Sequence, residues 1–189
     1  MKARLIITTG LLFFAMGNAA AWDIEQLMQS LALVRSSQAT FSEKKFIAIL
    51  DKPVESSGEL FYSAPDRIEK RTLKPRAESI MVQQGAIVVE RGRTKHRLQL
   101  QEYPELAAFV DSIRGTLAGD RKALERSFKL GLEGGAENWT LLLQPLREKL
   151  QDSIKHIRIA GVRDTVRSIE VMQADGDRSV MLIEKLVTP

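Results

Sequence analysis

The sequence predicts an α+β domain that is mainly β, with about ten to eleven short antiparallel strands in one curved sheet. Short segments with strand character follow one another and are separated by turn residues. Within these segments, apolar and polar residues alternate. Only two segments show the three-to-four-residue apolar spacing of an amphipathic helix. Such a series is typical of an antiparallel meander curled into a half-open or closed barrel.

The first helix is predicted over Asp23–Arg35. Asp23 is a favourable N-cap residue, and Ser36-Ser37 ends the helix. One apolar stripe is formed by Ile24, Leu27, Leu31 and Val34. A second helix is expected between Pro104 and Gly119. Its stripe consists of Leu106, Phe109, Val110, Ile113 and Leu117.

The other segments with regular alternation are predicted strands. Turn signals separate them, among them Asp51-Lys52-Pro53, Gln84-Gly85 and Gly134-Gly135. The strands are expected at Thr40–Leu50, Gly58–Ser63, Arg67–Leu73, Ser79–Gln83, Ala86–Glu90, Lys95–Gln101, Phe128–Leu132, Trp139–Leu143, Ile154–Ala160, Val166–Gln173 and Ser179–Leu186.

The distribution of apolar residues between the two faces of the predicted strands bears on function. In Gly58–Ser63, Leu60 and Tyr62 share one face while Glu59 and Ser63 share the other. The same alternation gives neighbouring segments one apolar face, which the two amphipathic helices are available to cover. The covered space is either a filled core or a lipid-sized cavity. Periodicity does not separate these two cases, and on this evidence alone it favours the filled core.

Residues 1–21 have the pattern of a cleavable signal peptide. A positively charged start precedes the apolar run Leu5–Met16, and Ala19-Ala20-Ala21 provides the small residues of a cleavage site. The run is shorter than the roughly twenty apolar residues of a spanning helix. We therefore expect an exported, periplasmic protein in which residues 22–189 form a single domain. An uncleaved N-terminal anchor is the alternative.

The charge of the chain is mild overall but unevenly distributed. Removing Lys2 and Arg4 takes the formal net charge from +4 to +2, which does not indicate a nucleic-acid partner. Across Arg67–Arg97, nine lysines and arginines accompany only three glutamates. This basic cluster is either a solvated sheet face or a surface that contacts anionic lipid headgroups or an acidic partner protein. Its candidate contact residues are Arg91, Arg93 and Lys95.

No catalytic or metal-binding constellation is evident in the sequence. The two histidines, His96 and His156, belong to no metal-ligand motif, and no cysteine occurs. A nucleophile elbow and a glycine-rich phosphate loop are also missing. We expect neither enzymatic activity nor a cofactor, and no disulfide or cysteine-linked lipid.

Several short motifs occur in a fixed order along the chain. They are Phe41-Ser42-Glu43-Lys44, Gly58-Glu59-Leu60-Phe61-Tyr62, the turn Ala64-Pro65-Asp66-Arg67-Ile68, Glu78–Gly85, Trp139–Pro145 and the hairpin Ile169–Ser179. In this order they resemble the LolA family of periplasmic lipoprotein carriers, with its F-x-x-K, G-x-L, x-P turn and S-I-x-V-x-x-G segments. Each motif is short, so the resemblance is specific as an ordered set.

The resemblance implies an incomplete antiparallel β-barrel whose concave apolar face is covered by helices. The hollow would shield acyl chains of a lipoprotein or other envelope lipid during transfer from the inner to the outer membrane. The implied partners are this lipid, an inner-membrane release complex and an outer-membrane acceptor, and the implied carrier is a monomer. The candidate cavity residues are Leu27, Leu31, Leu60, Tyr62, Ala64, Ile68, Ile80, Val82, Leu98 and Leu100. Ordinary core packing is the alternative for each of them.

Two features depart from the family pattern. Carriers of the family place an arginine immediately before the turn proline, where this chain has Ala64. They also continue beyond the last hairpin with another strand, whereas this sequence ends at Thr188-Pro189. Both differences favour a LolA-like relative that serves another lipid or recipient. The alternative function is a lipid-responsive envelope sensor or interaction module with the same fold.

Overall fold

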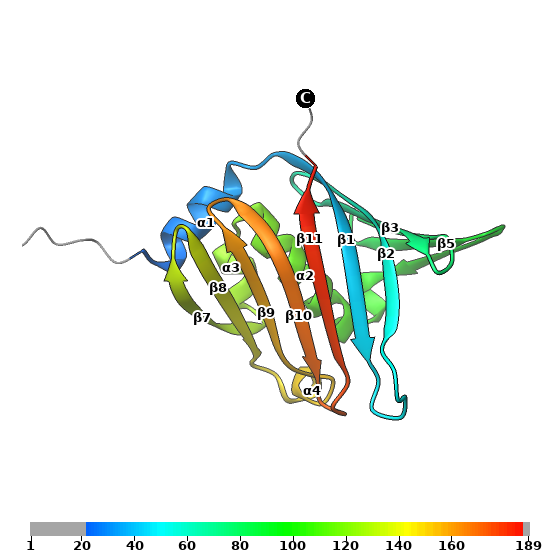
Figure 1. Cartoon of the computed structure of the whole chain (residues 1–189). Helices are drawn as coiled ribbons and strands as arrows, with labels where there is room; N and C mark the ends of the chain where they lie inside the picture. Colours follow the sequence, from blue (N-terminus) through cyan, green and yellow to red (C-terminus); the bar gives the residue numbers. More distant parts are fainter. Residues whose placement is uncertain (1–21, 187–189) are drawn as a thin grey trace, which may run out of the picture.

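A computed structural model describes residues 22–186 and shows one large sheet with helices on one of its faces (Figure 1). The predicted signal peptide, residues 1–21, lies outside the described residues, as do residues 187–189. The strands are β1 (Ser36–Phe46), β2 (Val54–Ser63), β3 (Arg67–Lys74), β4 (Glu78–Gln83), β5 (Ala86–Arg91), β6 (Thr94–Gln99), β7 (Phe128–Gly135), β8 (Asn138–Pro145), β9 (Ile154–Val162), β10 (Thr165–Gln173) and β11 (Arg178–Lys185).

The sheet is an antiparallel meander that is folded about its first strand. The strand order is β6-β5-β4-β3-β2-β1-β11-β10-β9-β8-β7, so β1 lies at the centre and pairs with both β2 and β11. The two edge strands, β6 and β7, are not neighbours, and the sheet therefore stays unclosed. This arrangement confirms the predicted mainly β, incomplete barrel of about ten to eleven strands.

The first strand differs from its predicted bounds. It was expected at Thr40–Leu50, but the β1–β2 ladder runs from the pair Ser36 and Ser63 to the pair Lys45 and Val54. Residues 47–53 form the connection between the strands, where the Leu50 amide donates to the Ile47 carbonyl at 2.9 Å. An apolar run within a hairpin loop has the composition of a strand, which explains the wrong boundary.

A second difference concerns Leu100, which was predicted to lie in a strand. β6 ends at Gln99, and Leu100–Glu102 form the 3₁₀-helix η1. The Leu100 amide donates to the Gly85 carbonyl at 2.9 Å, and the Tyr103 amide donates to the Leu100 carbonyl. The chain thereby turns away from the sheet edge and leads into the following helix.

Four α-helices accompany the sheet in the described part of the chain: α1 (Ile24–Ala32), α2 (Pro104–Ala118), α3 (Arg121–Glu125) and α4 (Glu148–Gln151). Asp23 caps α1 in a reciprocal capping box with Gln26, as its sequence position predicts. The helix ends before Val34, however, so this member of the predicted stripe lies beyond it. α2 matches its prediction and ends at Gly119 in the left-handed conformation. The sequence did not predict α3 and α4 because neither is long enough to show a periodic stripe.

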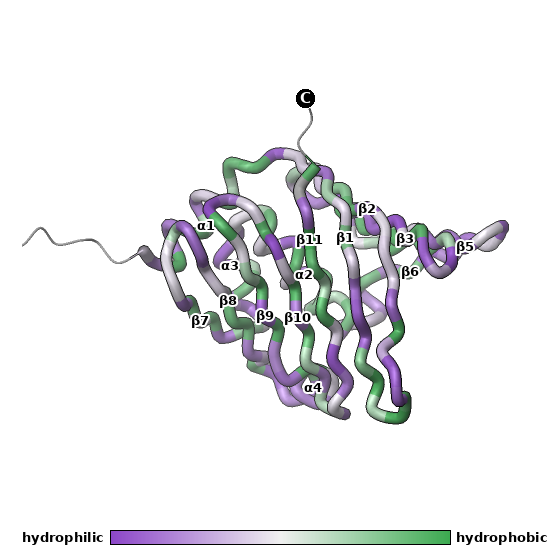
Figure 2. Tube along the Cα trace, in the orientation of Figure 1, coloured by the Kyte–Doolittle hydropathy of each residue, from purple (hydrophilic) through white to green (hydrophobic). Residues whose placement is uncertain are grey.

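The apolar side chains gather in two separate clusters on the concave face. The main core joins α1, α2 and α3 to the strands β7 to β10, with Leu27, Phe128, Trp139 and Leu141 at its centre. A smaller cluster contains Val82, Ile87, Leu100 and Val110. α2 contributes to both, through Ala108 and Val110 respectively. Along β8 to β11, hydrophobic and hydrophilic residues alternate, as one covered and one uncovered sheet face require (Figure 2).

Within residues 22–186, the helices are all too short or too polar to cross a membrane.

Gly119 provides a test of how closely α1 and α2 approach each other. Its φ is +65°, and a β-carbon there would lie 2.1 Å from the Met28 carbonyl oxygen of α1. Gly92 has a similar φ of +59° with no atom within 4 Å of such a β-carbon. We expect Gly92→Ala to cost about 1–2 kcal/mol from backbone strain alone. Gly119→Ala should cost about 1–3 kcal/mol more because of the added clash.

The free energy of unfolding in urea, measured for both variants and for the unsubstituted protein, checks this prediction. Equal losses for the two variants would show that α1 does not pack on Gly119.

Candidate binding cavity

A cavity of about 390 Å³ lies between the two apolar clusters. Its wall consists mainly of aliphatic side chains from the central strands and from α2. The strand residues that line it include Leu60, Ile68, Ile80, Val82, Ile87, Ile159, Ile169, Val171, Met181 and Ile183. The helices therefore do not fill the concave face, and of the two cases left open by periodicity the structure shows the cavity.

The α2 helix forms one side of this cavity. The five residues of its predicted apolar stripe, namely Leu106, Phe109, Val110, Ile113 and Leu117, all line the cavity. The sequence identified this stripe but did not assign it to the site. An amphipathic helix looks the same in sequence whether its apolar face meets a packed core or an empty volume.

Six of the ten candidate cavity residues line this volume: Leu31, Leu60, Tyr62, Ile68, Ile80 and Val82. They come from α1, β2, β3 and β4, so the fold brings together residues that the resemblance had grouped. Their contact with a lipid remains a prediction.

The other four candidate residues do not line the cavity. Leu27 lies one helical turn before Leu31 and is fully buried in the main core. Leu100 packs in the smaller cluster, and Leu98 pairs with Ile87 at the edge of the sheet. Ala64 follows β2, and its amide donates to the Arg35 carbonyl at 2.8 Å. A residue on the apolar face of the sheet therefore does not necessarily line the cavity, because this face extends beyond the cavity wall.

Tyr62 brings a polar atom into the apolar wall. Its side chain is only 6% exposed, and its hydroxyl has no hydrogen-bond partner among the described residues. Burial raises the pKa of the Tyr62 phenol above its ordinary value, and the nearby Arg35 charge opposes this rise. An unpaired buried hydroxyl destabilises a protein by about 1–3 kcal/mol. A bound molecule or water that bonded to it would offset this cost.

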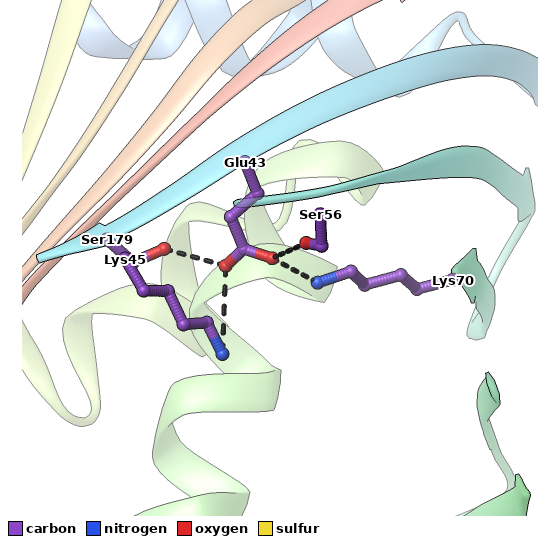
Figure 3. A network of polar contacts seen from close by, with 5 residues as sticks. All are labelled: Glu43, Lys45, Ser56, Lys70 and Ser179. Atoms are coloured by element: carbon purple, nitrogen blue, oxygen red, sulfur yellow. Dashed lines mark hydrogen bonds and ion pairs between the residues drawn. The ribbon is translucent and has the colours of Figure 1, made fainter. Parts of the chain in front are cut away.

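A polar cluster, Glu43, Lys45, Ser56, Lys70 and Ser179, lies on the same concave face (Figure 3). The Lys70 Nζ donates to the Glu43 carboxylate at 2.5 Å, and the Ser179 and Ser56 hydroxyls donate to it at 2.7 and 3.3 Å. The Lys45 Nζ lies 3.9 Å from the same carboxylate. Glu43, Lys45, Lys70 and Ser179 all line the cavity. The cavity wall therefore combines a long apolar surface with the charged region of this cluster, and Asp164 also lines it.

Glu43 is held ionised in this cluster although it is only 6% exposed. Burial by itself raises the pKa of the carboxyl group. The hydrogen bond and charge of Lys70, the Ser179 hydroxyl and the charge of Lys45 outweigh burial and hold the pKa of Glu43 below its ordinary value.

The polar cluster is not predicted by the sequence motifs, although alternation provides a signal for it. Lys70 lies two residues after Ile68 on the inward face of β3, and Glu43 lies two residues after the buried Phe41 on β1. A charged residue at an inward position is unusual in a filled core. The predicted apolar face was traced only through its apolar members, which concealed this exception.

Of the basic cluster, the candidate contact residues Arg91, Arg93 and Lys95 are exposed on the hairpin of β5 and β6 and do not line the cavity, whereas Lys70 does. Its charge is partly neutralised, since the Arg91 Nε donates to Glu78 at 2.8 Å and Lys95 pairs with Glu90 at 2.5 Å. Contact of this hairpin with lipid headgroups or a partner protein remains a prediction.

Comparison with known proteins places this architecture in a family. Residues 16–186 match the family described as outer membrane lipoprotein carrier protein LolA-like. No curated protein matches the sequence significantly.

The solved structures that the chain matches have low sequence identity to it. The LolA superfamily protein NE2245 of Nitrosomonas europaea is 11% identical, with 89% of this chain and 96% of that chain covered and a TM-score of 0.47. The MucA/MucB complex of Pseudomonas aeruginosa gives 16% identity, coverage of 88% and 58%, and a TM-score of 0.49. A DUF1329 family protein of Desulfovibrio piger gives 10% identity, coverage of 85% and 88%, and a TM-score of 0.48.

The family match extends from before α1 to the end of the described chain, and so includes every strand of the sheet and every helix that borders the cavity. The chain therefore belongs to the LolA-like family of outer membrane lipoprotein carrier proteins.

Proposed function

We propose that this protein is a periplasmic carrier that shields the acyl chains of a lipoprotein or another envelope lipid between the inner and the outer membrane. The supporting observation is the largely aliphatic cavity that α2 leaves open on the concave face. Its volume of about 390 Å³ falls within the range of small-molecule sites, roughly 300–1,000 Å³. The carrier would take its lipid from an inner-membrane release complex, give it to an outer-membrane acceptor, and work as a monomer after signal-peptide removal.

Burial of a hydrocarbon chain provides sufficient free energy for this role without covalent chemistry. Each methylene group removed from water contributes about 0.8 kcal/mol. Part of this gain is offset by the ordering of the chain and by the loss of its free translation. A surrounding wall of flexible aliphatic side chains adds dispersion contacts but imposes little directional preference. The apolar region therefore suits acyl chains in general more than one particular chain.

Native mass spectrometry of mature protein purified gently from its own envelope tests the carrier function directly. A stoichiometric acyl-bearing adduct is expected, with loss of the adduct under lipid-extracting conditions. Protein that carries no lipid and also fails to bind a fluorescent fatty acyl probe would contradict the proposal. A stable complex with one membrane signalling protein, unchanged by lipid load, would favour the sensor function instead.

Introducing a charge into the cavity wall should abolish lipid retention. Leu60 and Ile68 line the cavity and are only partly buried, so Leu60→Glu or Ile68→Glu leaves the new carboxylate access to water in the empty protein. Leu141, which is fully buried in the main core, provides the contrast. Leu141→Glu should unfold the domain because an unpaired buried charge costs several kcal/mol. Circular dichroism and retention of the acyl probe measure the two effects.

Unfolding by both cavity variants would show that these positions are solid core. Folded variants that retain the probe would show that the probe binds elsewhere.

Replacing Tyr62 by phenylalanine should stabilise the lipid-free protein. The hydroxyl is buried without a partner among the described residues, so its removal should raise the free energy of unfolding by about 1 kcal/mol. Urea unfolding of delipidated protein measures this change. A loss of stability on Tyr62→Phe would show that the hydroxyl is hydrogen-bonded in solution.

Neutralising the basic hairpin should weaken membrane docking but not cargo binding. Changing Arg91, Arg93 and Lys95 to glutamine removes three exposed charges, each worth about 1 kcal/mol near an anionic membrane. Flotation with anionic liposomes at low salt should show a drop of about an order of magnitude or more, and the difference should shrink as salt is added. A matched control replaces three exposed basic residues on β7 and β9, namely Lys129, Lys155 and Arg158.

Equal liposome binding by the hairpin variant and the unsubstituted protein would remove the headgroup role of this hairpin.

A further inference from the structure

We propose that the polar cluster is a binding site for one anionic headgroup, a carboxylate or a phosphate, of an amphiphile whose chain occupies the cavity. This inference rests on the proposed carrier function and adds to it a chemical class of cargo. The apolar wall alone does not distinguish a charged lipid from a neutral one. The polar cluster, whose residues come from four strands, provides the distinction.

The geometry of the cluster leaves donors free for a ligand. Glu43, from β1, is satisfied by hydrogen bonds from Lys70 of β3, Ser179 of β11 and Ser56 of β2. Each lysine ammonium has three N–H donors. Lys70 uses one of them on Glu43, and within the described residues Lys45 makes no hydrogen bond, its Nζ lying 3.9 Å from Glu43. Both lysines line the cavity, so donors that are not used by Glu43 are available to a molecule inside it.

The charge of the cluster also favours an anion. One carboxylate and two ammonium groups line this part of the cavity, which gives a net charge of +1. The two ammonium groups are unequal: the Lys70 side chain is 24% exposed and lies over the Phe41 ring, while the Lys45 side chain is 53% exposed. Glu43 holds Lys70 in place, and Lys45 is free to reorient toward a ligand. A bound monoanion would neutralise the cluster.

The position of the polar cluster determines how a ligand would be oriented in the cavity. In the β1–β2 ladder, Glu43 pairs with Ser56 and Ser37 pairs with Tyr62. Glu43 lies six positions after Ser37, which corresponds to roughly 20 Å along an extended strand. Apolar side chains, including Ala39 and Leu60, line the cavity between these ends. The headgroup would therefore lie at the Glu43 end, with the hydrocarbon chain extending along β1 toward Tyr62.

The alternative for the cluster is a purely structural ion pair. Buried ion pairs contribute little net stability because desolvation offsets the attraction between the charges. A structural pair predicts that any substitution in the cluster either destabilises the domain or has no effect on ligand choice. A headgroup site predicts opposite effects for the removal of a positive and of a negative charge.

The experiment uses the delipidated mature protein and displacement of a fluorescent acyl probe. Three competitors of equal chain length are compared at a pH where the acids are ionised: a saturated fatty acid, its methyl ester and the corresponding alkyl phosphate. We expect at least one of the two anions to bind about tenfold more tightly than the neutral ester, as one charge-assisted hydrogen bond would provide. Preference for only one anion identifies which headgroup the site accepts.

Three variants of the cluster test the role of charge. Lys45→Gln should abolish the preference for the anion, and Lys45→Arg should restore it. Glu43→Gln should increase the preference, because it leaves both ammonium groups without a fixed partner. Lys44→Gln is the matched control, since Lys44 points to the opposite face of β1 and pairs with Glu55 at 2.9 Å. Affinity for the methyl ester is the neutral reference within each variant, and Lys44→Gln should leave the affinity for all three competitors unchanged.

Equal affinity of all three competitors for the unsubstituted protein would overturn the headgroup site while leaving the carrier function intact. Anion preference that is unchanged by Lys45→Gln, or that moves in the same direction in Lys45→Gln and Glu43→Gln, would also overturn it. Failure of the protein to bind the probe or any competitor would instead contradict the carrier function itself.

Discussion

A single α-helix spanning an open sheet is the constraint on which this structure depends. The eleven-stranded sheet presents one apolar face, and α2, with fifteen residues, is the longest of the helices in the described chain. At 1.5 Å per residue it reaches about 22 Å. α1 and α3 join α2 in the main core with β7 to β10, whereas α2 is the only α-helix of the described chain in the smaller cluster. Apolar surface on the central strands therefore remains available to a ligand.

The two apolar clusters explain why the cavity does not collapse. α2 packs in the main core through Ala108 and in the smaller cluster through Val110, two positions further along the helix. The strands beneath it are held apart by continuous antiparallel ladders, including the β1–β11 pairing that joins the two halves of the sheet. Movement of α2 into the hollow would break packing in both clusters. Packing in the two apolar clusters thus keeps α2 in place and preserves the cavity.

The charges in the cavity wall are as informative as its apolar residues. The Glu43 carboxylate is costly to bury, and a sheet that needed only a filled core would gain by replacing it and its partners with hydrocarbon. Here Glu43 is fully hydrogen-bonded, while Lys45 keeps its donors. The carboxylate of Glu43 has its hydrogen bonds made, whereas the ammonium group of Lys45 has donors to spare. This arrangement is more typical of a binding surface than of a structural ion pair.

Local patterns in the sequence were sufficient to determine most of the elements and the fold class, because alternation, caps and turn residues act over a few neighbouring residues. They located α2 and most of the eleven strands, and the ordered motifs identified the LolA-like family. These patterns predicted the wrong element at residues 47–50 and at Leu100. Backbone hydrogen bonds place residues 47–50 in a loop and Leu100 in a 3₁₀-helix despite their apolar composition. Only the tertiary structure decided that Leu31 reaches the cavity while Leu27 is core, and that Glu43 meets Lys70. Those distinctions depend on how far a helix lies from a curved sheet and on which strands become neighbours, and neither is a property of any local segment.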